Sequence, residues 1–262
     1  MIRNWSTAVG EAFRTVRGRD RRTVRGRDRR PVRRPAPVTY GLIVLCCLLF
    51  LISPASGLDP SYGSADELLA AQRAYFRRWG VIPADLFEGS PRALWTPLTA
   101  LFVHGGWVHL LGNMLFLYVF GVMTEERMGR ARFLLFFLGC GYLALLGYAI
   151  ANDHSRQSLV GASGAISAVL GAFLYLFPRA RVTSLLPFLL FMPLRFPAWL
   201  VLPFWAALQW LSAWRAGDGP GVAYLAHLVG FGLGFLCAWV WNGRRARVRS
   251  APATAPEGEN QP

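Results

Sequence analysis

The stretch Gly161-Ala162-Ser163-Gly164-Ala165 opens an apolar segment that continues to Phe177. Small residues on both sides of a hydroxyl let another backbone, or a substrate, approach the oxygen closely. In a segment apolar enough to lie in a membrane, such a serine needs a chemical explanation as well as a packing one. Ser163 is therefore the first candidate functional residue of the chain.

The composition is that of a membrane protein. Of the 262 residues, 54% are hydrophobic and only 16% are charged, which is more apolar content than one soluble core can bury. The formal net charge is +14, and all 28 basic residues are arginines that crowd the two tails and the links between apolar runs. This distribution is typical of membrane topology signals and does not indicate nucleic-acid binding. The cysteines all fall within apolar runs, where we expect free thiols without a function: Cys46, Cys47, Cys140 and Cys237.

Six apolar runs approach the roughly 20 residues needed to cross about 30 Å of hydrocarbon. They cover approximately residues 40–57, 108–124, 133–151, 161–177, 196–214 and 222–241. We therefore expect an all-α, polytopic bundle of six transmembrane helices. The start of the fifth run can shift by several residues, because Pro193, Pro197 and Pro203 interrupt it and Arg195 indicates an interfacial stretch before it.

Arginine asymmetry predicts the orientation. With the N-terminus inside, 22 of the 28 arginines lie on the cytoplasmic side, as the positive-inside rule favours. Both termini of this integral membrane protein are therefore expected in the cytoplasm. The expected parts are a disordered Arg-rich tail at 1–37, a membrane domain at 38–243 and a cytoplasmic C-terminal tail at 244–262.

The N-terminal tail carries a tandem octad, Arg-Thr-Val-Arg-Gly-Arg-Asp-Arg, at 14–21 and again at 22–29. Such a run cannot bury apolar surface, so we expect it to be disordered, either as a topology anchor or lying on anionic lipid headgroups. A cleaved signal peptide is not expected, since the basic region is too long and no small-residue cleavage site follows the first apolar run.

The segment between the first two runs, residues 58–107, is long for a membrane connection. Apolar residues such as Leu69 and Trp79 alternate there with charged ones such as Asp66 and Arg77, which suits an amphipathic helix at the membrane interface. A solvated loop with scattered aromatic residues is an equally good interpretation.

Four polar side chains fall at similar depth in the expected membrane. The second, fourth and sixth runs all begin on the outer side. His109 and Asn113 lie one turn apart on one face of the second, Ser163 is in the first turn of the fourth, and His227 is about six residues into the sixth. A single buried histidine is as readily a structural residue, but four such groups on three helices are poorly explained by packing.

Small residues recur at helical spacing on the fourth and sixth runs, a pattern that lets two helix backbones touch. They are Gly164, Ala168 and Gly171, facing Ala226, Gly230 and Gly234. Such contact would bring His227 to hydrogen-bonding distance of Ser163. The fourth run spans only about 25 Å, so its outer end should stop below the surface, with the polar stretch 152–158 admitting water. We expect His154 in that stretch to be solvated.

These residue types suit nucleophilic catalysis. A serine hydroxyl becomes a good nucleophile when a base takes its proton, and His227 is the candidate base for Ser163. The carboxylates fall in loops, so we expect a Ser-His dyad rather than a triad. His109, Asn113 and the backbone N–H of Ser163 are the candidate oxyanion donors. His104 is either a partner that orients the loop or a plain interfacial residue.

Four strings then occur in order along the chain. They are His104-Gly-Gly-Trp-Val-His109-Leu-Leu-Gly-Asn113, Glu125-Glu-Arg127-Met-Gly129, Gly161-Ala-Ser163-Gly164 and Ala226-His227-Leu-Val-Gly230-Phe-Gly-Leu-Gly234. Together they resemble the rhomboid family of intramembrane serine proteases over about residues 40–241. The resemblance implies a six-helix rhomboid of bacterial type in the inner (plasma) membrane. It also implies that Ser163 is the nucleophile, His227 the base, and His109 and Asn113 oxyanion-site residues.

The resemblance implies further roles away from these residues. Glu125 and Arg127 would tie the inner link between the second and third helices, segment 58–107 would be a lateral loop, and the fifth helix would be a gate for substrate. The chain departs from the family in one place, because the frequent Trp-Arg of the outer loop is Trp95-Thr96 here. A hydrogen-bonding role for that arginine is therefore not carried over.

The expected function is a membrane-embedded serine endopeptidase that cleaves transmembrane segments of other proteins within membrane lipid. No cofactor, metal or nucleic-acid partner is expected. Substrate helices must unwind to expose a carbonyl, so small or helix-destabilising residues are expected near the cut. One alternative is a non-catalytic rhomboid-like protein that binds membrane clients. The presence of both Ser163 and His227 argues against this alternative. The other is a small-solute transporter, for which paired interrupted helices in two repeated halves are missing.

Overall fold

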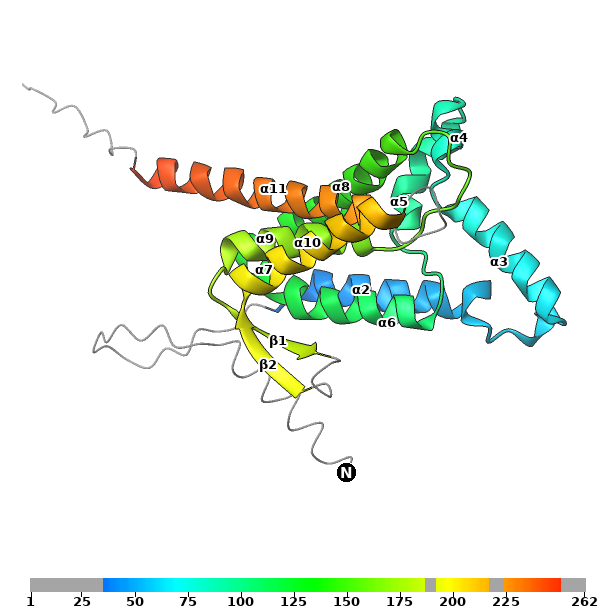
Figure 1. Ribbon diagram of the computed structural model, residues 1–262, viewed down its shortest axis with the longest axis horizontal. Helices are drawn as coiled ribbons and strands as arrows, with labels where there is room; N and C mark the ends of the chain where they lie inside the picture. Colours follow the sequence, from blue (N-terminus) through cyan, green and yellow to red (C-terminus); the bar gives the residue numbers. More distant parts are fainter. Residues whose placement is uncertain (1–34, 187–191, 217–223, 251–262) are drawn as a thin grey trace, which may run out of the picture.

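The computed structural model describes residues 35–186, 192–216 and 224–250, most of which are helical (Figure 1). In chain order the helices are α2 (Pro37–Leu51), α3 (Ala65–Trp79), α4 (Pro83–Phe87), α5 (Thr96–Ala100), α6 (Trp107–Phe116), α7 (Val122–Met128), α8 (Arg130–Ala151), α9 (Ser163–Leu176), α10 (Ala198–Ala216) and α11 (Tyr224–Ser250). A π-helical segment, Leu117–Gly121, makes α6 and α7 one continuous helix. Short 3₁₀ turns lie at Pro54–Ser56, Pro60–Tyr62 and Pro91–Trp95.

Each of the six predicted apolar runs contains a helix. Within the described residues, three helices are long and apolar enough to cross a membrane, namely Trp107–Met128, Arg130–Ala151 and Tyr224–Asn242. Pro37–Leu51 and Ser163–Leu176 are shorter apolar helices. Helix α11 also continues to Ser250, past the boundary predicted at residue 243, because no proline interrupts the arginine-rich sequence there. The predicted disordered tail falls almost wholly outside the described residues.

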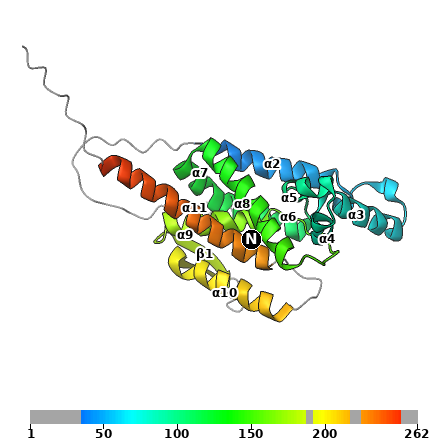
Figure 2. The same cartoon turned by 90° about the horizontal axis from the view of Figure 1, so that it is seen from above.

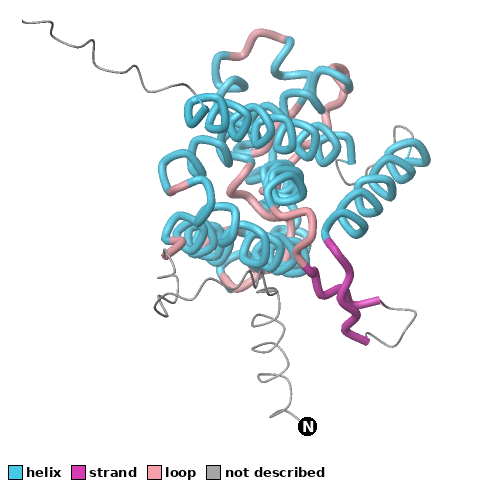
Figure 3. The backbone as a smooth tube through the Cα atoms, turned by 90° about the vertical axis from the view of Figure 1, so that its left-hand side faces the viewer, coloured by secondary structure: helices cyan, strands magenta, loops and turns pink. Residues whose placement is uncertain are grey.

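A β-hairpin corrects the expectation of an all-α fold. Strand β1 (Arg181–Leu186) pairs antiparallel with β2 (Met192–Pro197), and Arg181 lies opposite Pro197. Figures 1 and 3 show this hairpin standing outside the helix bundle. Prolines disfavour a helix here, so Phe196 belongs to the strand and the fifth helix begins only at Ala198. The N–H groups of Ala198 and Trp199 donate to carbonyls that follow α9, which fixes the start of α10.

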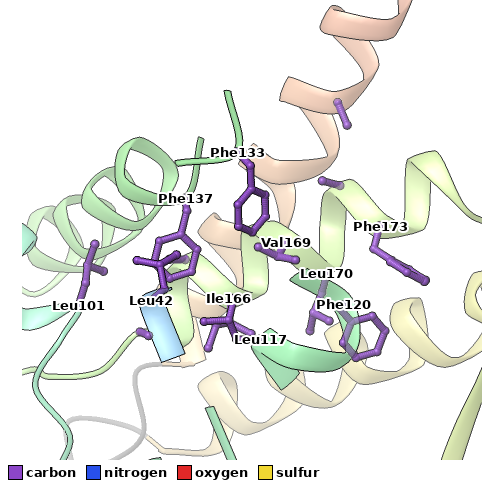
Figure 4. Packing of buried hydrophobic residues seen from close by; sticks show 14 of the residues in the cluster. Leu42, Leu101, Leu117, Phe120, Phe133, Phe137, Ile166, Val169, Leu170 and Phe173 are labelled. Carbon is purple, nitrogen blue, oxygen red and sulfur yellow. The ribbon is translucent and has the colours of Figure 1, made fainter. Parts of the chain in front are cut away.

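Helix α9 provides the centre of the core, because every residue from Gly164 to Phe173 is buried. Figure 4 shows Val169, Leu170 and Phe173 of this helix gathered with Phe133 of α8 and Phe120 of the π-helical segment. The rings of Phe120 and Phe173 meet edge to face with centroids 5.0 Å apart. Burial of α9 on all sides explains why its sequence carries no charged residue.

The other helices surround α9. Its most extensive contact is with α11, and α8 packs against both (Figure 1). In the view from above, α2 and α10 lie on opposite sides of this group (Figure 2). The sulfur atoms of Cys140 on α8 and Cys237 on α11 are 3.9 Å apart, and all four cysteines are free thiols, as predicted.

The long segment after α2 contains the predicted amphipathic helix. Ser64 and Glu67 form a capping box at the start of α3, and Arg77 and Arg78 lie in its last turn, where the helix dipole favours cations. None of its residues is buried, in keeping with a helix on the edge of the fold. Its position at a membrane interface stays a prediction. The Thr96 hydroxyl donates to the Ala93 carbonyl and closes the turn into α5.

The carboxylate of Glu125 anchors the start of α2. Although Glu125 is only 1% exposed, its two oxygens accept from the N–H groups of Val38 and Thr39 at 3.1 and 2.7 Å and from the Thr39 hydroxyl at 2.7 Å. The first N–H groups of a helix have no partner within it, so this acceptor satisfies them. The resemblance had implied a tie between the second and third helices instead. Arg127 is exposed and, among the described residues, forms no ion pair with Glu125.

Replacing Glu125 by alanine is expected to destabilise the fold by about 2–4 kcal/mol, because it removes a charged acceptor and leaves buried donors unpaired. Thermal unfolding of the purified protein in detergent measures the effect. Glu126→Ala, at the next position and only partly buried, is the matched control and should change stability by less than about 0.5 kcal/mol. Equal melting temperatures for the two variants would contradict this anchoring role.

Candidate active site

Ser163 is held at the first position of α9 by an unusual backbone turn. Gly161, two residues earlier, has φ +123, a conformation that residues with a side chain rarely adopt, and its N–H donates to the Ala100 carbonyl at 2.9 Å. Helix α9 begins directly after this turn, so the Ser163 N–H has no earlier carbonyl of the helix to pair with. The hydroxyl therefore sits at the positive end of a buried helix.

The imidazole of His227 lies beside that hydroxyl. Its Nε2 is 2.8 Å from the Ser163 oxygen, and the side chain belongs to the first turns of α11 and is only 8% exposed. On the other side of the ring, Nδ1 is 2.8 Å from the amide oxygen of Gln209 on α10. The rings of Trp205 and Tyr224 flank it, with centroids 6.1 and 6.4 Å away.

Backbone contact between α9 and α11 brings serine and histidine together. A Cβ atom added at Gly230 would overlap the Gly164 carbonyl, one at Gly234 would overlap the Ala168 carbonyl, and one at Gly171 would overlap the Phe231 carbonyl. No residue larger than glycine fits at these positions without moving a helix. The close contact of α9 with α11 that the small-residue pattern predicted is confirmed. It places His227 within hydrogen-bonding distance of Ser163.

His109 and Asn113 lie near Ser163, one turn apart on α6. The Gly105 N–H donates to Nδ1 of His109 at 3.3 Å, so the neutral ring carries its proton on Nε2. That nitrogen is 2.7 Å from where a Cβ of Gly161 would be, next to Ser163. Asn113 donates one of its amide hydrogens to the His109 carbonyl at 3.0 Å and keeps the other for a further acceptor. Both residues therefore have a donor available near the serine.

A cavity of about 130 Å³ opens between α6, α9, α10 and α11 at these residues. Its walls are formed by Gly112, Asn113, Phe116, Ser163, Ile166, Ser167, Leu170, Trp205 and His227. The volume admits a few water molecules or one small side chain. Within the described parts of the chain, no three His, Cys, Asp or Glu side chains gather in a way that could hold a metal ion.

The chain has two further histidines, His104 and His154. His104 is 1% exposed, and its ring meets the edge of His109 with centroids 5.4 Å apart, so a plain interfacial role is wrong. Burial, and then the neighbouring His109, lower the pKa of His104 to about 4, which keeps the ring neutral at pH 7. His154 is exposed in the loop before α9, as predicted.

Gln209 is not among the residues expected from the sequence, where only a carboxylate was expected to serve as a third group. The signal was nevertheless present, since a glutamine within the apolar run 196–214 is as conspicuous as a histidine within another apolar run. What the sequence does not disclose is which face of α10 turns toward α11. Among the described residues, no carboxylate is hydrogen-bonded to His227.

These features define a helical membrane protein with a Ser-His pair at the N-terminal end of a buried central helix. Comparison with known proteins identifies the family to which the chain belongs. The model of the Rhomboid domain matches residues 91–244, more than half of the chain, and the chain belongs to the rhomboid family. It is accordingly a polytopic membrane protein.

Individual relatives are similar over shorter stretches. "Rhomboid protein 1, mitochondrial" of Saccharomyces cerevisiae is 32% identical over 160 residues, which are 57% of this chain and 44% of that protein. "RHOMBOID-like protein 1" of Arabidopsis thaliana is 32% identical over 148 residues, or 56% and 34% of the two chains. "Rhomboid protease GluP" of Bacillus subtilis is 40% identical over 81 residues, or 31% and 15%. The matches thus span less than half the length of each of these relatives.

Proposed function

We propose that the protein is an intramembrane serine endopeptidase that cleaves transmembrane segments of membrane proteins with Ser163 and His227. The observation that carries this proposal is the 2.8 Å separation of the Ser163 oxygen and Nε2 of His227 inside an apolar helix bundle. A nucleophile and base within hydrogen-bonding distance are the geometric signature of covalent acyl transfer.

In the proposed reaction, the Ser163 hydroxyl gives its proton to Nε2 of His227 as the oxygen bonds to the scissile carbonyl carbon. The tetrahedral intermediate then collapses, the C–N bond breaks, and His227 returns the proton to the leaving amine. A water molecule, deprotonated by the same imidazole, hydrolyses the acyl-enzyme to a carboxylic acid and restores the serine. The cycle needs neither a metal nor a redox partner to balance.

The oxyanion of the intermediate is proposed to be held by Nε2–H of His109, the free amide hydrogen of Asn113 and the Ser163 N–H. Support comes from the donor that each of these groups has available beside Gly161 and Ser163. Removing one such donor typically costs about 2.7–4 kcal/mol of barrier. Since these donors are fixed before substrate arrives, they need no reorganisation during the reaction.

A recess for hydrolysis follows from the length of α9. Its 14 residues cover about 21 Å, less than the roughly 30 Å of a hydrocarbon core, so its N-terminal end stays below the surface if the other end reaches the opposite interface. We infer six membrane-crossing helices (α2, α6–α7, α8, α9, α10 and α11), cytoplasmic termini and residence in a bacterial inner membrane. The membrane domain is proposed to cover about residues 38–243, with flanking tails at 1–37 and 244–262.

A non-catalytic protein that binds membrane clients is the competing function. Such a protein has no need of a serine and a histidine at hydrogen-bonding distance with further hydrogen-bond donors nearby, so the geometry favours catalysis. The two functions differ in whether the serine reacts.

A serine-directed fluorophosphonate probe separates the two. We expect the detergent-purified protein to be labelled at Ser163, and labelling to be lost in Ser163→Ala and to fall by about 10²-fold or more in rate in His227→Ala, because the alcohol then lacks its base. Labelling is quantified by in-gel fluorescence and mapped by mass spectrometry. An unlabelled wild-type protein that still melts cooperatively would support the client-binding function instead.

A further inference from the structure

We propose that Gln209 is a positioning residue for His227, an inference that rests on the proposed endopeptidase function. The amide oxygen of Gln209 is 2.8 Å from Nδ1 of His227, on the side of the ring opposite Ser163. The arrangement is a serine, a histidine and a neutral amide in line, where sequence reasoning expected a dyad.

The chemistry of the amide oxygen decides the tautomer of the ring. A carboxamide oxygen only accepts, so Nδ1 must carry the hydrogen and donate it. A neutral imidazole protonated on Nδ1 has a free lone pair on Nε2, which is the nitrogen next to the Ser163 hydroxyl. Gln209 thereby selects the one neutral form of His227 that is able to take a proton from the serine. The opposite tautomer would present an N–H to the hydroxyl and leave it without a base.

The position of Gln209 on its helix supports this role. Its neighbours Leu208 and Trp210 are 43% and 69% exposed and face outward, whereas Gln209 is partly buried and turns toward α11. Trp205, one turn earlier on the same face, places its ring 6.1 Å from that of His227 and lines the cavity. Helix α10 thus places the ring of Trp205 and the amide oxygen of Gln209 against the imidazole of His227. Together they restrict both the tilt and the rotation of that ring.

An amide differs from a carboxylate in what it does to the charged ring. Both accept from Nδ1–H, but a carboxylate also stabilises the imidazolium that forms when the serine is deprotonated, and a neutral amide does so far less. A glutamine suits a site beneath the membrane surface, because an ionised carboxylate there is costly to bury except while a protonated ring pairs with it. Gln209 therefore orients the base without adding a charge.

Helix α10 lies at the edge of the bundle, on the side away from α2 (Figure 2). Its contacts are mainly with α11, and its contact with α9 is much smaller than that between α9 and α11. Orientation of His227 by Gln209 consequently holds only while α10 is seated against α11. His227 belongs to α11, whereas the residue that orients its ring belongs to α10.

The test uses the full chain in detergent, a purified transmembrane-segment substrate and three variants. In Gln209→Leu we expect kcat to fall by about 10- to 100-fold with KM changed less than about threefold, part of the roughly 10²–10⁴ that a positioned general base contributes. Leu208→Ala, at the neighbouring outward-facing position, should keep kcat within about twofold. In Gln209→Glu we expect kcat at the optimum to be retained and the acidic midpoint of the pH–rate profile to move to higher pH, since a carboxylate favours the protonated ring.

A merely structural role for Gln209 predicts a different pattern. It would lower the melting temperature in Gln209→Leu and leave the acidic midpoint of Gln209→Glu where the wild type has it. Full kcat in Gln209→Leu, or superposable pH profiles for Gln209→Glu and the wild type, would overturn the inference while leaving the proposed function intact. A wild-type protein that neither cleaves substrate nor reacts with fluorophosphonate would instead overturn both.

Discussion

Replacing Ser163 by alanine is expected to abolish cleavage of a transmembrane-segment substrate, with kcat lowered at least about 10⁴-fold. The variant loses the atom that forms the acyl-enzyme, and the nearest other hydroxyl does not replace it. Ser167 lines the same cavity one turn later, but its hydroxyl already donates to the Ser163 carbonyl at 2.7 Å. The measurement is the appearance of cleaved product by gel and mass spectrometry.

Loss of His227 should have nearly the same effect on cleavage as loss of Ser163. Because the serine and its base act together, His227→Ala is expected to lose nearly as much activity as Ser163→Ala, and the double variant no more than either. Ser61→Ala, which removes an exposed hydroxyl far along the chain from the cavity, is the control and should cleave at the wild-type rate. Product formation by Ser163→Ala above the level seen without enzyme would show that another group is the nucleophile.

The features that were predicted correctly are those that local sequence determines. Hydrophobic runs of helical length located the helices, and small residues at i, i+4 spacing on α9 and α11 predicted a backbone contact that the structure confirms. Since a helix has a fixed rise and period, placing Ser163 and His227 near the starts of two touching helices was enough to place them side by side. The catalytic roles of these residues remain proposals.

The features that were missed depend on how distant segments meet. Nothing near Glu125 in the sequence reveals that its partners are Val38 and Thr39, more than 80 residues away. The hairpin of β1 and β2 was missed because the prolines around residue 193 were interpreted as interruptions of a helix and not as the edges of strands. Gln209 was missed for a similar reason, since the rotation of α10 about its axis is set by packing and not by its own composition.

His104 illustrates the same limit within a recognised motif. Its spacing from His109 allowed either an orienting or an interfacial role, because the short irregular stretch before α6 does not fix the direction of a side chain by its sequence alone. In the fold, the chain between α5 and α6 turns His104 inward against the His109 ring, where it is almost fully buried. Burial of this kind is decided by the packing of neighbouring helices.

The second large effect is expected at the contact of α9 and α11. Replacing Gly234 by valine introduces a side chain where even a Cβ would overlap the Ala168 carbonyl, so α11 must move away from α9. Overpacking of a core typically costs about 1–3 kcal/mol, and backbone against backbone leaves little room to relax. Because His227 is two turns earlier on α11, this movement should also break its 2.8 Å approach to Ser163. We expect cleavage to fall by 10²-fold or more, on the order of 3 kcal/mol in barrier.

Gly232, two residues away on the same helix, is the matched control. A Cβ there meets nothing within 4 Å, so Gly232→Ala should keep full activity and, because alanine favours a helix by up to about 1 kcal/mol over glycine, the same or a higher melting temperature. Gly234→Ala is the same substitution at a position where the added Cβ would overlap the Ala168 carbonyl. It should lower both the activity and the melting temperature. The two alanine variants therefore differ only in contact with α9, and an equal response from both would mean that the backbone contact does not hold His227 against Ser163.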